Sequence, residues 1–374
     1  MKVPLLDLKA QYDSIRSEAE EVMRRVVESQ YFVLSEEVSS LETEVAAYCG
    51  TSLGAGVASG TDALILALKA IGIKPDDIVI TTPFTFFATS ESISLLGARP
   101  LFADIDPETY NIDPASIEDL IENADHHIRS RIKAIIPVHL YGQCADMDRI
   151  MDLASRYGLK VVEDCAQAIG AVYKGRKAGS FGQTGCLSFF PSKNLGAFGD
   201  GGMVVSSDMG IIDRIKRLRV HGSNELYVHE EIGYNSRLDS LQAAVLRVKL
   251  RKLDEWLEKR RSIAERYNNA FRPLGLVVPK VAEGNIHTYH QYTIALDDRN
   301  ELLSYLNDKG IAARVYYPVP LHLQPCYRGL GYSIGSLMNS ERAAERVLSL
   351  PVYAELSNEQ IDYIVGTVTE FVNR

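Results

Sequence analysis

Hydrophobic positions along this chain follow a helical spacing near the start and then form short apolar runs separated by helical segments. Residues 15–47 predict two amphipathic helices that are interrupted around residues 29–35. In the second of these helices, Val38, Leu41 and Val45 follow the spacing of a face that packs against a core. From residue 54 onward, apolar runs typical of buried strands alternate with helical patterns. This alternation predicts an α/β fold with a mostly parallel sheet and helices on both faces.

The same pattern divides the chain into two lobes. In the first lobe, strands are predicted at residues 54–58, 77–82, 100–104, 134–139, 159–163, 186–190 and 202–206, with helices at 61–70, 88–96, 147–157 and 208–218. A long helical segment from residue 238 has apolar residues at a and d spacing, and we place the lobe boundary within it. We expect a large lobe at residues 1–245 and a small α+β lobe at residues 246–374. The small lobe is predicted to contain strands at residues 287–295 and 312–317, and helices at 301–309 and from residues 340 and 357.

Composition and charge narrow the class of protein. With 374 residues, of which 46% are hydrophobic and 24% charged, the chain can bury a large core. No apolar run approaches the ~20 residues of a membrane span, and the start lacks an extended signal-peptide core, so we expect a cytoplasmic protein with no membrane partner. The net charge of −9 argues against a general nucleic-acid binder. Five scattered cysteines without a C-x-x-C pair predict neither disulfides nor a zinc site.

Two residues of opposite charge lie where an α/β sheet binds its ligands. Residues 160–166 predict a buried strand that ends on Glu163 and Asp164, and the carboxyl ends of such strands form ligand sites. Lys193 follows another predicted strand, between apolar residues and four glycines. A lysine and an aspartate in one site suit pyridoxal phosphate, which needs an amine for a Schiff base and an anion beside its ring nitrogen. A buried structural ion pair is the alternative.

A Ser-Gly-Thr turn at residues 59–61 offers a second binding feature. Because it lies between a predicted strand and a predicted helix, its backbone N–H groups and the Thr61 hydroxyl can bind a phosphate. Ordinary capping of a buried helix is the alternative. Ser188 could reach the same phosphate, and Phe86 could lie flat on an aromatic cofactor, although residues of both types are more often structural. The nearby glycines have the spacing G-x-G-x-x-x-G, which differs from the dinucleotide-binding fingerprint.

Several short motifs, in one order along the chain, resemble those of a known family. They are Ser59-Gly60-Thr61-Asp62-Ala63-Leu64, Phe84-Thr85-Phe86, Tyr141-Gly142-Gln143, Glu163-Asp164-Cys165-Ala166-Gln167-Ala168, Ser188-Phe189-Phe190-Pro191-Ser192-Lys193, Gly199-Asp200-Gly201-Gly202 and Asn235-Ser236-Arg237-Leu238-Asp239. With these motifs, essentially the whole chain resembles the pyridoxal-phosphate-dependent nucleotide-sugar aminotransferases of the DegT/StrS type. The resemblance implies the aspartate aminotransferase fold, which is fold type I of the pyridoxal-phosphate transferases.

The resemblance also implies roles for individual residues. Lys193 would form the Schiff base and move a proton between the cofactor and the sugar carbon, while Asp164 would hold the ring nitrogen in its protonated form. The other cofactor contacts would come from Phe86 against the ring, Gln167 beside the hydroxyl group, and Gly60, Thr61 and Ser188 around the phosphate. The cofactor would alternate with its pyridoxamine phosphate form. Asn235 would reach the phosphate from a neighbouring subunit, so the resemblance implies a homodimer with active sites at its interface.

The substrates implied by the resemblance are a nucleotide-linked keto sugar and an amino-acid donor, expected to be glutamate. Arg237 is a candidate for binding the diphosphate, and Tyr316, Tyr317 and His322 lie in a proline-rich loop expected on the substrate side. Gln167 is typical of relatives that act at carbon 3, which favours a UDP- or dTDP-linked 3-keto hexose in amino-sugar or lipopolysaccharide synthesis. Amination at carbon 4 is one alternative. A sugar dehydratase of the same fold is another, although such enzymes carry histidine in place of the Schiff-base lysine.

Overall fold

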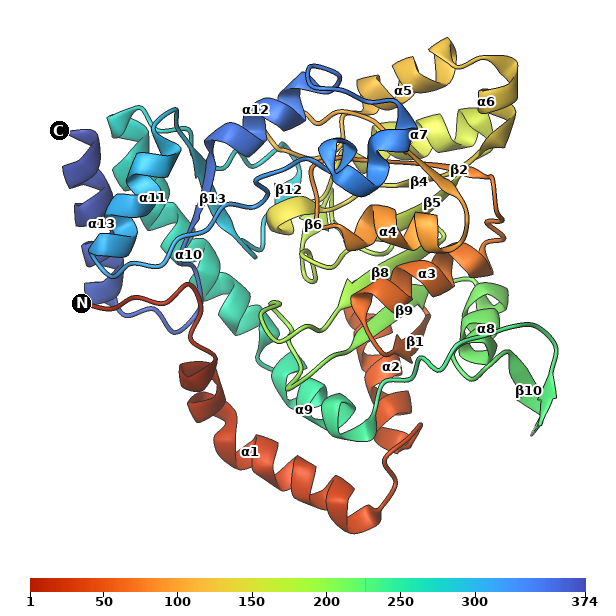
Figure 1. Cartoon of the computed structure of the whole chain (residues 1–374). Coiled ribbons are helices and arrows are strands. Elements are labelled where there is room, and N and C mark those ends of the chain that lie inside the picture. The colour runs from red at the N-terminus through yellow and green to blue at the C-terminus, as the bar shows by residue number, and fades with distance from the viewer. Residues whose placement is uncertain (226) are drawn as a thin grey trace.

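The computed structural model describes all residues except 226, and its centre is a seven-stranded sheet (Figure 1). In order across the sheet, the strands are β1 (Leu53–Val57), β9 (Gly202–Ser206), β8 (Thr184–Ser188), β5 (Lys160–Asp164), β4 (Ile132–Ile136), β2 (Ile78–Thr81) and β3 (Arg99–Phe102). β9 runs antiparallel to both of its neighbours, and the other pairs are parallel. The predicted α/β fold with a mixed, mostly parallel sheet is therefore confirmed.

Helices cover both faces of this sheet, because its central strands carry apolar side chains on both sides. Val161 and Val162 of β5, for example, are both fully buried and belong to different cores. The helices that pack on one face are α3 (Gly60–Ala70), α4 (Ala88–Leu95) and α8 (Met209–Leu218). Those on the other face are α2 (Glu36–Cys49), α5 (Pro114–Asn123), α7 (Met147–Tyr157) and α9 (Ser240–Leu250). The large lobe is thus a three-layer sandwich.

The N-terminal helix lies outside these layers. α1 (Leu8–Ser29) packs against α9 and contacts Trp256 through its apolar residues. The chain leaves α1 and enters α2 within the predicted interruption between the two helices. Ahead of α1, Val3 forms a β-bridge with Ile311, and Figure 1 shows both chain termini on the side of the small lobe. The N-terminal segment therefore joins the two lobes.

The long helix predicted from residue 238 is two helices in the structure. α9 ends at Leu250, and α10 (Leu253–Phe271) follows it. α9 packs with α1 and α2 of the large lobe, whereas α10 packs with α13 (Asn358–Val372) of the small lobe. The division after residue 245 thus falls inside α9, and the extent of the two domains stays a prediction.

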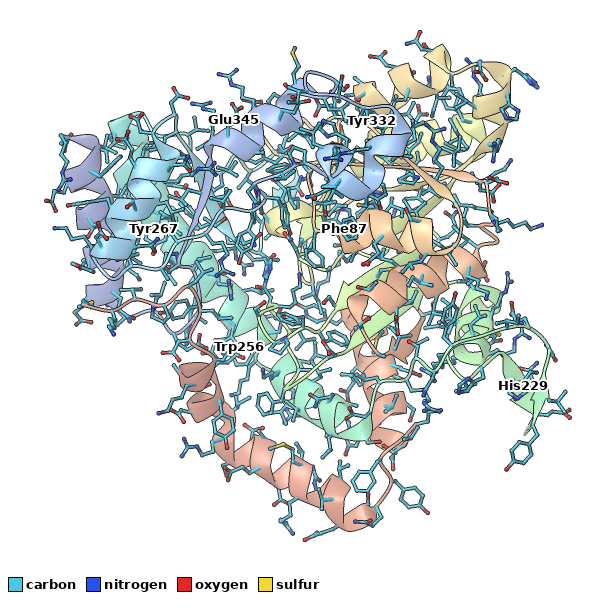
Figure 2. The ribbon with its side chains drawn as sticks, viewed as in Figure 1. Phe87, His229, Trp256, Tyr267, Tyr332 and Glu345 are labelled. Atoms are coloured by element: carbon cyan, nitrogen blue, oxygen red, sulfur yellow. The ribbon has the colours of Figure 1, made fainter. Side chains whose placement is uncertain are left out.

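Aromatic side chains form much of the core of the small lobe. Tyr267, which Figure 2 shows among the helices of this lobe, stacks on Phe271 with a centroid distance of 5.6 Å. It also meets Tyr292 edge-on at 5.0 Å. β13 (Tyr292–Ala295) and β14 (Val347–Leu350) form an antiparallel pair beside this cluster. The other helices are α11 (Arg299–Asp308) and α12 (Met338–Arg346).

Two strand predictions in the small lobe are wrong in extent. Residues 312–317 form no strand beyond an isolated bridge between Arg314 and Ser349. The prolines that follow at positions 318 and 320 lack the N–H group that a strand ladder needs. The strand predicted from residue 287 begins only at Tyr292, because Tyr289 has a φ of 46°, in the left-handed region.

The remaining elements are short. α6 is His126–Arg131, and a small sheet has the order β12 (Asn285–Ile286), β6 (Val172–Tyr173), β7 (Arg176–Lys177). β10 (Ser223–Glu225) and β11 (Val228–His229) pair at the edge of the large lobe, where Figure 1 shows β10 projecting from the molecule. Among the described helices, none has the length and apolar character needed to cross a membrane.

Candidate active site

A cavity of about 400 Å³ lies where the carboxyl ends of β5 and β8 meet the N-terminus of α3 and the small lobe. Most of the residues predicted for the site line it. They are Gly60, Thr61, Phe86, Asp164, Gln167, Ser188, Lys193, Tyr316 and Tyr317. The fold therefore brings residues from both lobes together around Lys193 and Asp164.

The loop that carries Lys193 is held by backbone contacts and by a second, buried lysine. The N–H of Lys193 donates to the carbonyl oxygen of Phe190 at 2.8 Å. Position 196 must be glycine, because a Cβ there would lie 2.3 Å from the carbonyl oxygen of Pro191. Lys249 of α9, which is 1% exposed, donates from Nζ to the carbonyl oxygen of Gly196 at 2.6 Å. The position of Lys193 thus depends on α9 as well as on its own loop.

The surroundings of Lys193 disfavour its charged form. Burial among protein atoms lowers the pKa of Lys193 to about 8, and the negative charge of Asp164 partly opposes this shift. The side chain keeps some exposed surface because it lines the cavity. Near pH 8, about half of the amine is therefore in the neutral form, which is the nucleophilic one.

Asp164 is fixed by hydrogen bonds to both carboxylate oxygens. Thr89 donates from Oγ1 to Oδ2 at 2.8 Å, and the N–H of Ala166 donates to Oδ1 at 3.1 Å. Asp164 is 5% exposed and lines the cavity, so its remaining lone pairs can accept from a bound group. Thr89 was not predicted from the sequence. The available signal was its place in the first turn of the helix that follows Phe86, after another strand of the same sheet.

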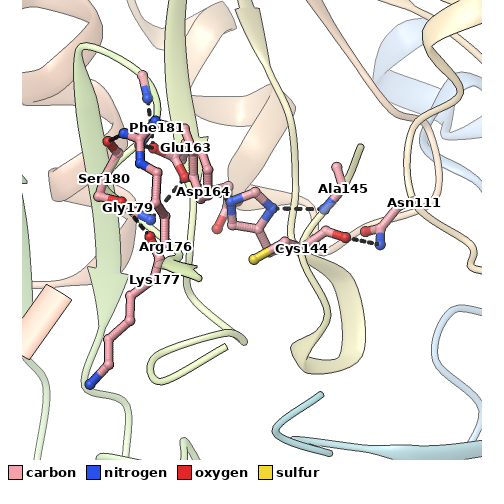
Figure 3. A network of polar contacts seen from close by, with 12 residues as sticks. Asn111, Cys144, Ala145, Glu163, Asp164, Arg176, Lys177, Gly179, Ser180 and Phe181 are labelled. Carbon is pink, nitrogen blue, oxygen red and sulfur yellow. Dashed lines mark hydrogen bonds and ion pairs between the residues drawn. The ribbon is translucent and has the colours of Figure 1, made fainter. Parts of the chain in front are cut away.

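The residue before Asp164 is a carboxylate with no exposed surface. Glu163 accepts hydrogen bonds from three backbone N–H groups of the loop at residues 179–182, and Figure 3 shows the loop and the carboxylate together. The donors are Phe181 (2.7 Å) and Gly182 (2.8 Å) to Oε1, and Gly179 (2.8 Å) to Oε2. Glu163 therefore fastens this loop to the end of β5.

His139 is the fourth partner of Glu163. Its Nε2 lies 2.9 Å from Oε2, and its Nδ1 accepts the N–H of Ala145 at 3.2 Å, which places the ring proton on Nε2. Cys165 completes a buried group of three potential metal ligands with these two side chains. Because the ring nitrogens and both carboxylate oxygens already have hydrogen-bond partners, hydrogen bonding alone accounts for the arrangement.

Gln167 links the large lobe to the tyrosines of the small lobe. Its Oε1 accepts the N–H of Tyr141 at 2.7 Å, and its Nε2 donates to the Tyr317 hydroxyl at 2.9 Å. The Tyr141 hydroxyl in turn donates to the carbonyl oxygen of Tyr316. Burial raises the pKa of Tyr317, so its hydroxyl stays protonated. The amide of Gln167 therefore has a fixed orientation beside Asp164.

The turn before α3 forms the opposite end of the cavity. Ser59 caps the helix by accepting the N–H of Asp62 at 3.1 Å, and the first turn of α3 has no other side-chain cap. A Cβ at Gly60 would lie 2.7 Å from the Cβ of Ser188, and one at Gly202 would lie 2.3 Å from the carbonyl oxygen of Ser59. Glycine is therefore needed for this helix terminus to approach β8 and β9. Its N–H groups form an anion-binding end.

These residues fit pyridoxal phosphate. The cavity offers a lysine amine, an aspartate with free lone pairs and a helix N-terminus flanked by hydroxyl groups. Phe86 is 59% exposed although it lines the cavity, and its ring lies 6.5 Å from that of Tyr317. An aromatic ring that is exposed in this place can cover a flat cofactor.

Three predicted residues lie outside the cavity. Asn235 is exposed, and Arg237 on the same segment is half-buried. Ser236, between them, donates from Oγ to Oδ2 of Asp62 at 2.6 Å and so attaches this segment to α3. His322 lies in a short turn and does not line the cavity. It is 1% exposed, and its Nε2 lies 3.1 Å from Oε1 of Glu341. Within one chain, His322 therefore has a structural partner, and its contact with substrate stays a prediction.

The cavity wall also contains residues that the sequence did not predict. Leu5 and Leu6 of the N-terminal segment line it, as do Arg260 of α10 and His290 ahead of β13. Burial lowers the pKa of His290, and the positive charges of Lys193 and Arg260 lower it further. No local motif marks these positions, because their place in the site follows only from the packing of the small lobe.

Comparison with known proteins gives one family for nearly the whole chain. The model of the DegT/DnrJ/EryC1/StrS aminotransferase family matches residues 13–369. A Geobacillus stearothermophilus protein named "Pleiotropic regulatory protein" is 48% identical over 99% of each chain. The UDP-N-acetyl-3-dehydro-alpha-D-glucosamine 3-aminotransferase of Acidithiobacillus ferrooxidans is 44% identical over 98% of this chain and 97% of the relative. The dTDP-3-amino-3,4,6-trideoxy-alpha-D-glucose transaminase of Streptomyces venezuelae is 42% identical over 100% and 97%.

Solved structures agree with this match. The crystal structure of S. venezuelae DesV in complex with a ketimine intermediate superposes with a TM-score of 0.95. It is 41% identical, and the alignment covers 100% of this chain and 99% of that one. The architecture of both lobes is therefore shared.

The Glu163 network predicts a loss of stability when its charge is removed. In Glu163→Gln, the amide NH₂ group would face donors that now point at a carboxylate oxygen, leaving at least one buried donor without a partner. We expect the free energy of unfolding, measured by urea denaturation, to fall by about 1–3 kcal/mol.

The matched control is Glu258→Gln, which alters an exposed carboxylate paired with Arg261. It should change the free energy of unfolding by less than about 0.5 kcal/mol. A Glu163→Gln protein as stable as wild type would show that the network contributes no net stability.

Proposed function

The chain belongs to the DegT/DnrJ/EryC1/StrS aminotransferase family, and on that premise we propose that it moves an amino group from glutamate to carbon 3 of a UDP- or dTDP-linked 3-keto hexose. It is an aminotransferase that uses pyridoxal phosphate. The observation that carries the proposal is the presence of Lys193, Asp164 and Gln167 in the wall of one cavity.

Pyridoxal phosphate, when bound, supplies the carbonyl group that takes up and releases the amino group, and the ring that draws electrons from the substrate carbon. Lys193 Nζ would hold the cofactor and, as a free amine, carry a proton to and from the substrate carbon. Asp164, oriented by Thr89 and Ala166, would keep the proton on the ring nitrogen. The first role needs the neutral amine, which burial favours, and the second needs a carboxylate whose direction is fixed.

The other cavity residues would position the cofactor. Phe86 would cover the ring, and Gln167 would lie beside its hydroxyl group. Gly60, Thr61 and Ser188 would hold the phosphate with the N-terminus of α3, whose positive end favours an anion. The close packing of Gly60 against Ser188 supports this placement.

Two features support carbon 3 as the site of amination. Gln167 is the residue type associated with carbon 3 in the resembling family, and relatives at 44% and 42% identity are named for amination of 3-keto or 3-amino sugars. A sugar dehydratase is disfavoured because position 193 is lysine. One relative is named as a regulator, but Lys193 and Asp164 are both retained here, as transamination requires.

We also propose that the active enzyme is a homodimer of the cytoplasm, acting in the synthesis of amino sugars for cell-surface polysaccharides such as lipopolysaccharide. Asn235 is exposed in the single chain and lies outside its cavity. It would complete the phosphate site of a second subunit, with Arg237 available for the diphosphate of the sugar nucleotide. Tyr316 and Tyr317 would contact the substrate from the small lobe.

The lowered pKa of Lys193 predicts how cofactor loading depends on pH. The rate at which cofactor-free enzyme acquires its visible absorbance band should rise about tenfold per pH unit below pH 8 and level off above it, since burial sets the pKa of Lys193 near 8. Lys193→Ala should not form the band. The control is the reaction of the cofactor with a free primary amine of ordinary pKa. The rate of that reaction should keep rising above pH 8. A loading rate that follows the free amine across this range would contradict the role of burial.

Subunit complementation tests the dimer. Lys193→Ala and Asn235→Asp should each be inactive, the second because a negative charge would face the phosphate. After the two proteins are mixed in equal amounts and exchange subunits, half of the dimers are mixed, and one of the two sites in each mixed dimer has both native residues. Activity should therefore return to roughly a quarter of wild type. The measurement is glutamate-dependent amination after mixing. Exchange without recovery would mean that Asn235 acts in its own chain or not at all.

The reverse reaction tests the sugar carbon. Wild-type enzyme with 2-oxoglutarate should form glutamate from UDP- or dTDP-linked 3-amino sugars and at least tenfold more slowly from the matched 4-amino sugars, a difference of about 1.4 kcal/mol in transition-state binding. Glutamate release can be followed directly. Turnover confined to 4-amino sugars would remove the carbon 3 assignment and leave the aminotransferase activity in place.

A further inference from the structure

Arg260 of α10 places a buried positive charge in the wall of the active-site cavity. It is 5% exposed and lines the same cavity as Lys193. Its Nη1 donates to three backbone carbonyl oxygens, those of Tyr289 (3.0 Å), His290 (3.5 Å) and Val352 (2.7 Å). Across the described residues, Nε and Nη2 of Arg260 make no hydrogen bond. One edge of the guanidinium group is therefore fastened to the small lobe, and the other edge keeps its donors.

The charge environment of this guanidinium group is unusual for a buried arginine. In the described part of the protein, no carboxylate lies within 4.0 Å of it, so it forms no salt bridge. Glu355 is close enough to stabilise the charge at longer range, but burial dominates and lowers the pKa of Arg260 to about 10. His290, the neighbouring titratable group in the wall, is held neutral by burial and by the charges of Lys193 and Arg260. A buried cation in these surroundings is costly unless an anion completes the site.

We infer that Arg260 binds a carboxylate of the amino-acid donor, and of the 2-oxo acid that the donor becomes, through Nε and Nη2. The inference rests on the proposed function and adds the donor subsite to it. A guanidinium edge with two parallel donors matches a carboxylate in a bidentate pair. The three carbonyl contacts of Nη1 hold that edge in place before the donor arrives, which lowers the entropy lost on binding.

The other anions of the reaction have better places elsewhere. The phosphate of the cofactor suits the N-terminus of α3, where Gly60, Thr61 and Ser188 line the cavity. The diphosphate of a sugar nucleotide is attached to a nucleoside that needs room toward solvent, whereas Arg260 is almost fully enclosed. A small carboxylate is the anion that can reach an enclosed guanidinium group next to the reacting amine.

The experiment compares the two half-reactions of the loaded enzyme in Arg260→Lys. Lysine keeps the charge but loses the planar pair of donors. The apparent Kd for glutamate and for 2-oxoglutarate should rise at least about tenfold, as expected for losing a charge-assisted pair. The half-reaction with the amino-sugar nucleotide should change less than about twofold. Arg261→Lys, which alters the next residue and its exposed pair with Glu258, should change neither half-reaction.

Different carboxylates identify which group of the donor is bound. Alanine lacks the distal carboxylate of glutamate, and 4-aminobutyrate lacks the one next to the amine. If Arg260 holds the distal carboxylate, Arg260→Lys should leave the affinity for alanine unchanged and weaken binding of 4-aminobutyrate. If Arg260 holds the carboxylate next to the amine, the two donors should show the opposite pattern. Equal sensitivity of both half-reactions, or a loss confined to the sugar nucleotide, would overturn the inference.

Wild-type protein provides a direct check that does not depend on a variant. In a crystal structure of the holoenzyme with 2-oxoglutarate, a carboxylate oxygen should lie within hydrogen-bond distance of Nε or Nη2 of Arg260, and a carboxylate held elsewhere overturns the inference. If wild type accepts an amino group from no amino acid, the proposed function itself fails. If it accepts glutamate and Arg260→Lys binds it equally well, only the donor subsite is wrong.

Discussion

The buried negative charge of Glu163 is the constraint on which the geometry of this site depends. A carboxylate with no exposed surface must have every oxygen hydrogen-bonded, and here four donors meet that need. These bonds fix the loop at residues 179–182 and the ring of His139 around the end of β5. The backbone of Asp164 is held against the segment at residues 137–139, since its N–H donates to Pro137 (2.9 Å) and its carbonyl oxygen accepts from the N–H of His139 (3.0 Å). The direction of the Asp164 carboxylate is therefore set before any cofactor binds.

The two lobes contribute opposite electrostatic features to the cavity. The large lobe supplies a fixed carboxylate at Asp164, whose oxygens have neutral donors as partners. The small lobe supplies Arg260, whose charge adds positive potential, and His290, which burial and the charges of Lys193 and Arg260 hold neutral. Burial works against charge on Lys193 and Arg260 alike, so the cavity gains by admitting anions. Aminotransfer uses such anions in each half of its cycle, so a cavity lined by both lobes suits the chemistry.

Local signals in the sequence were sufficient to place three cavity residues of the large lobe. Asp164 follows a buried strand, Gly60 lies in a strand-to-helix turn, and Lys193 lies in a glycine-rich loop, so each could be placed from its neighbours and from the topology of parallel strands. Arg260 and His290 carry no such signal. Arg260 lies on the buried face of an ordinary amphipathic helix, and only the packing of α10 within the small lobe, where Nη1 meets the carbonyl oxygens of Tyr289 and Val352, brings it to the cavity. The strand predicted at residues 312–317 failed for a related reason, because apolar pattern alone does not supply the pairing partner that a strand needs.

The same dependence on packing extends to Lys193. Lys249 donates to the loop of Lys193 at Gly196 and to Oε1 of Gln11 in α1 at 2.9 Å. Burial lowers the pKa of Lys249 to about 8, and the negative charge of Glu355 partly opposes this shift. The face of the Phe198 ring lies 4.7 Å from Nζ and adds a favourable contact for the cation. α1, which lies outside the layers, and α9, which packs on one face of the sheet, thus share one buried cation with the loop that carries Lys193. Leu5 and Leu6, in the segment ahead of α1, also line the cavity. The N-terminal segment and α1 are therefore part of the structure that forms the active site.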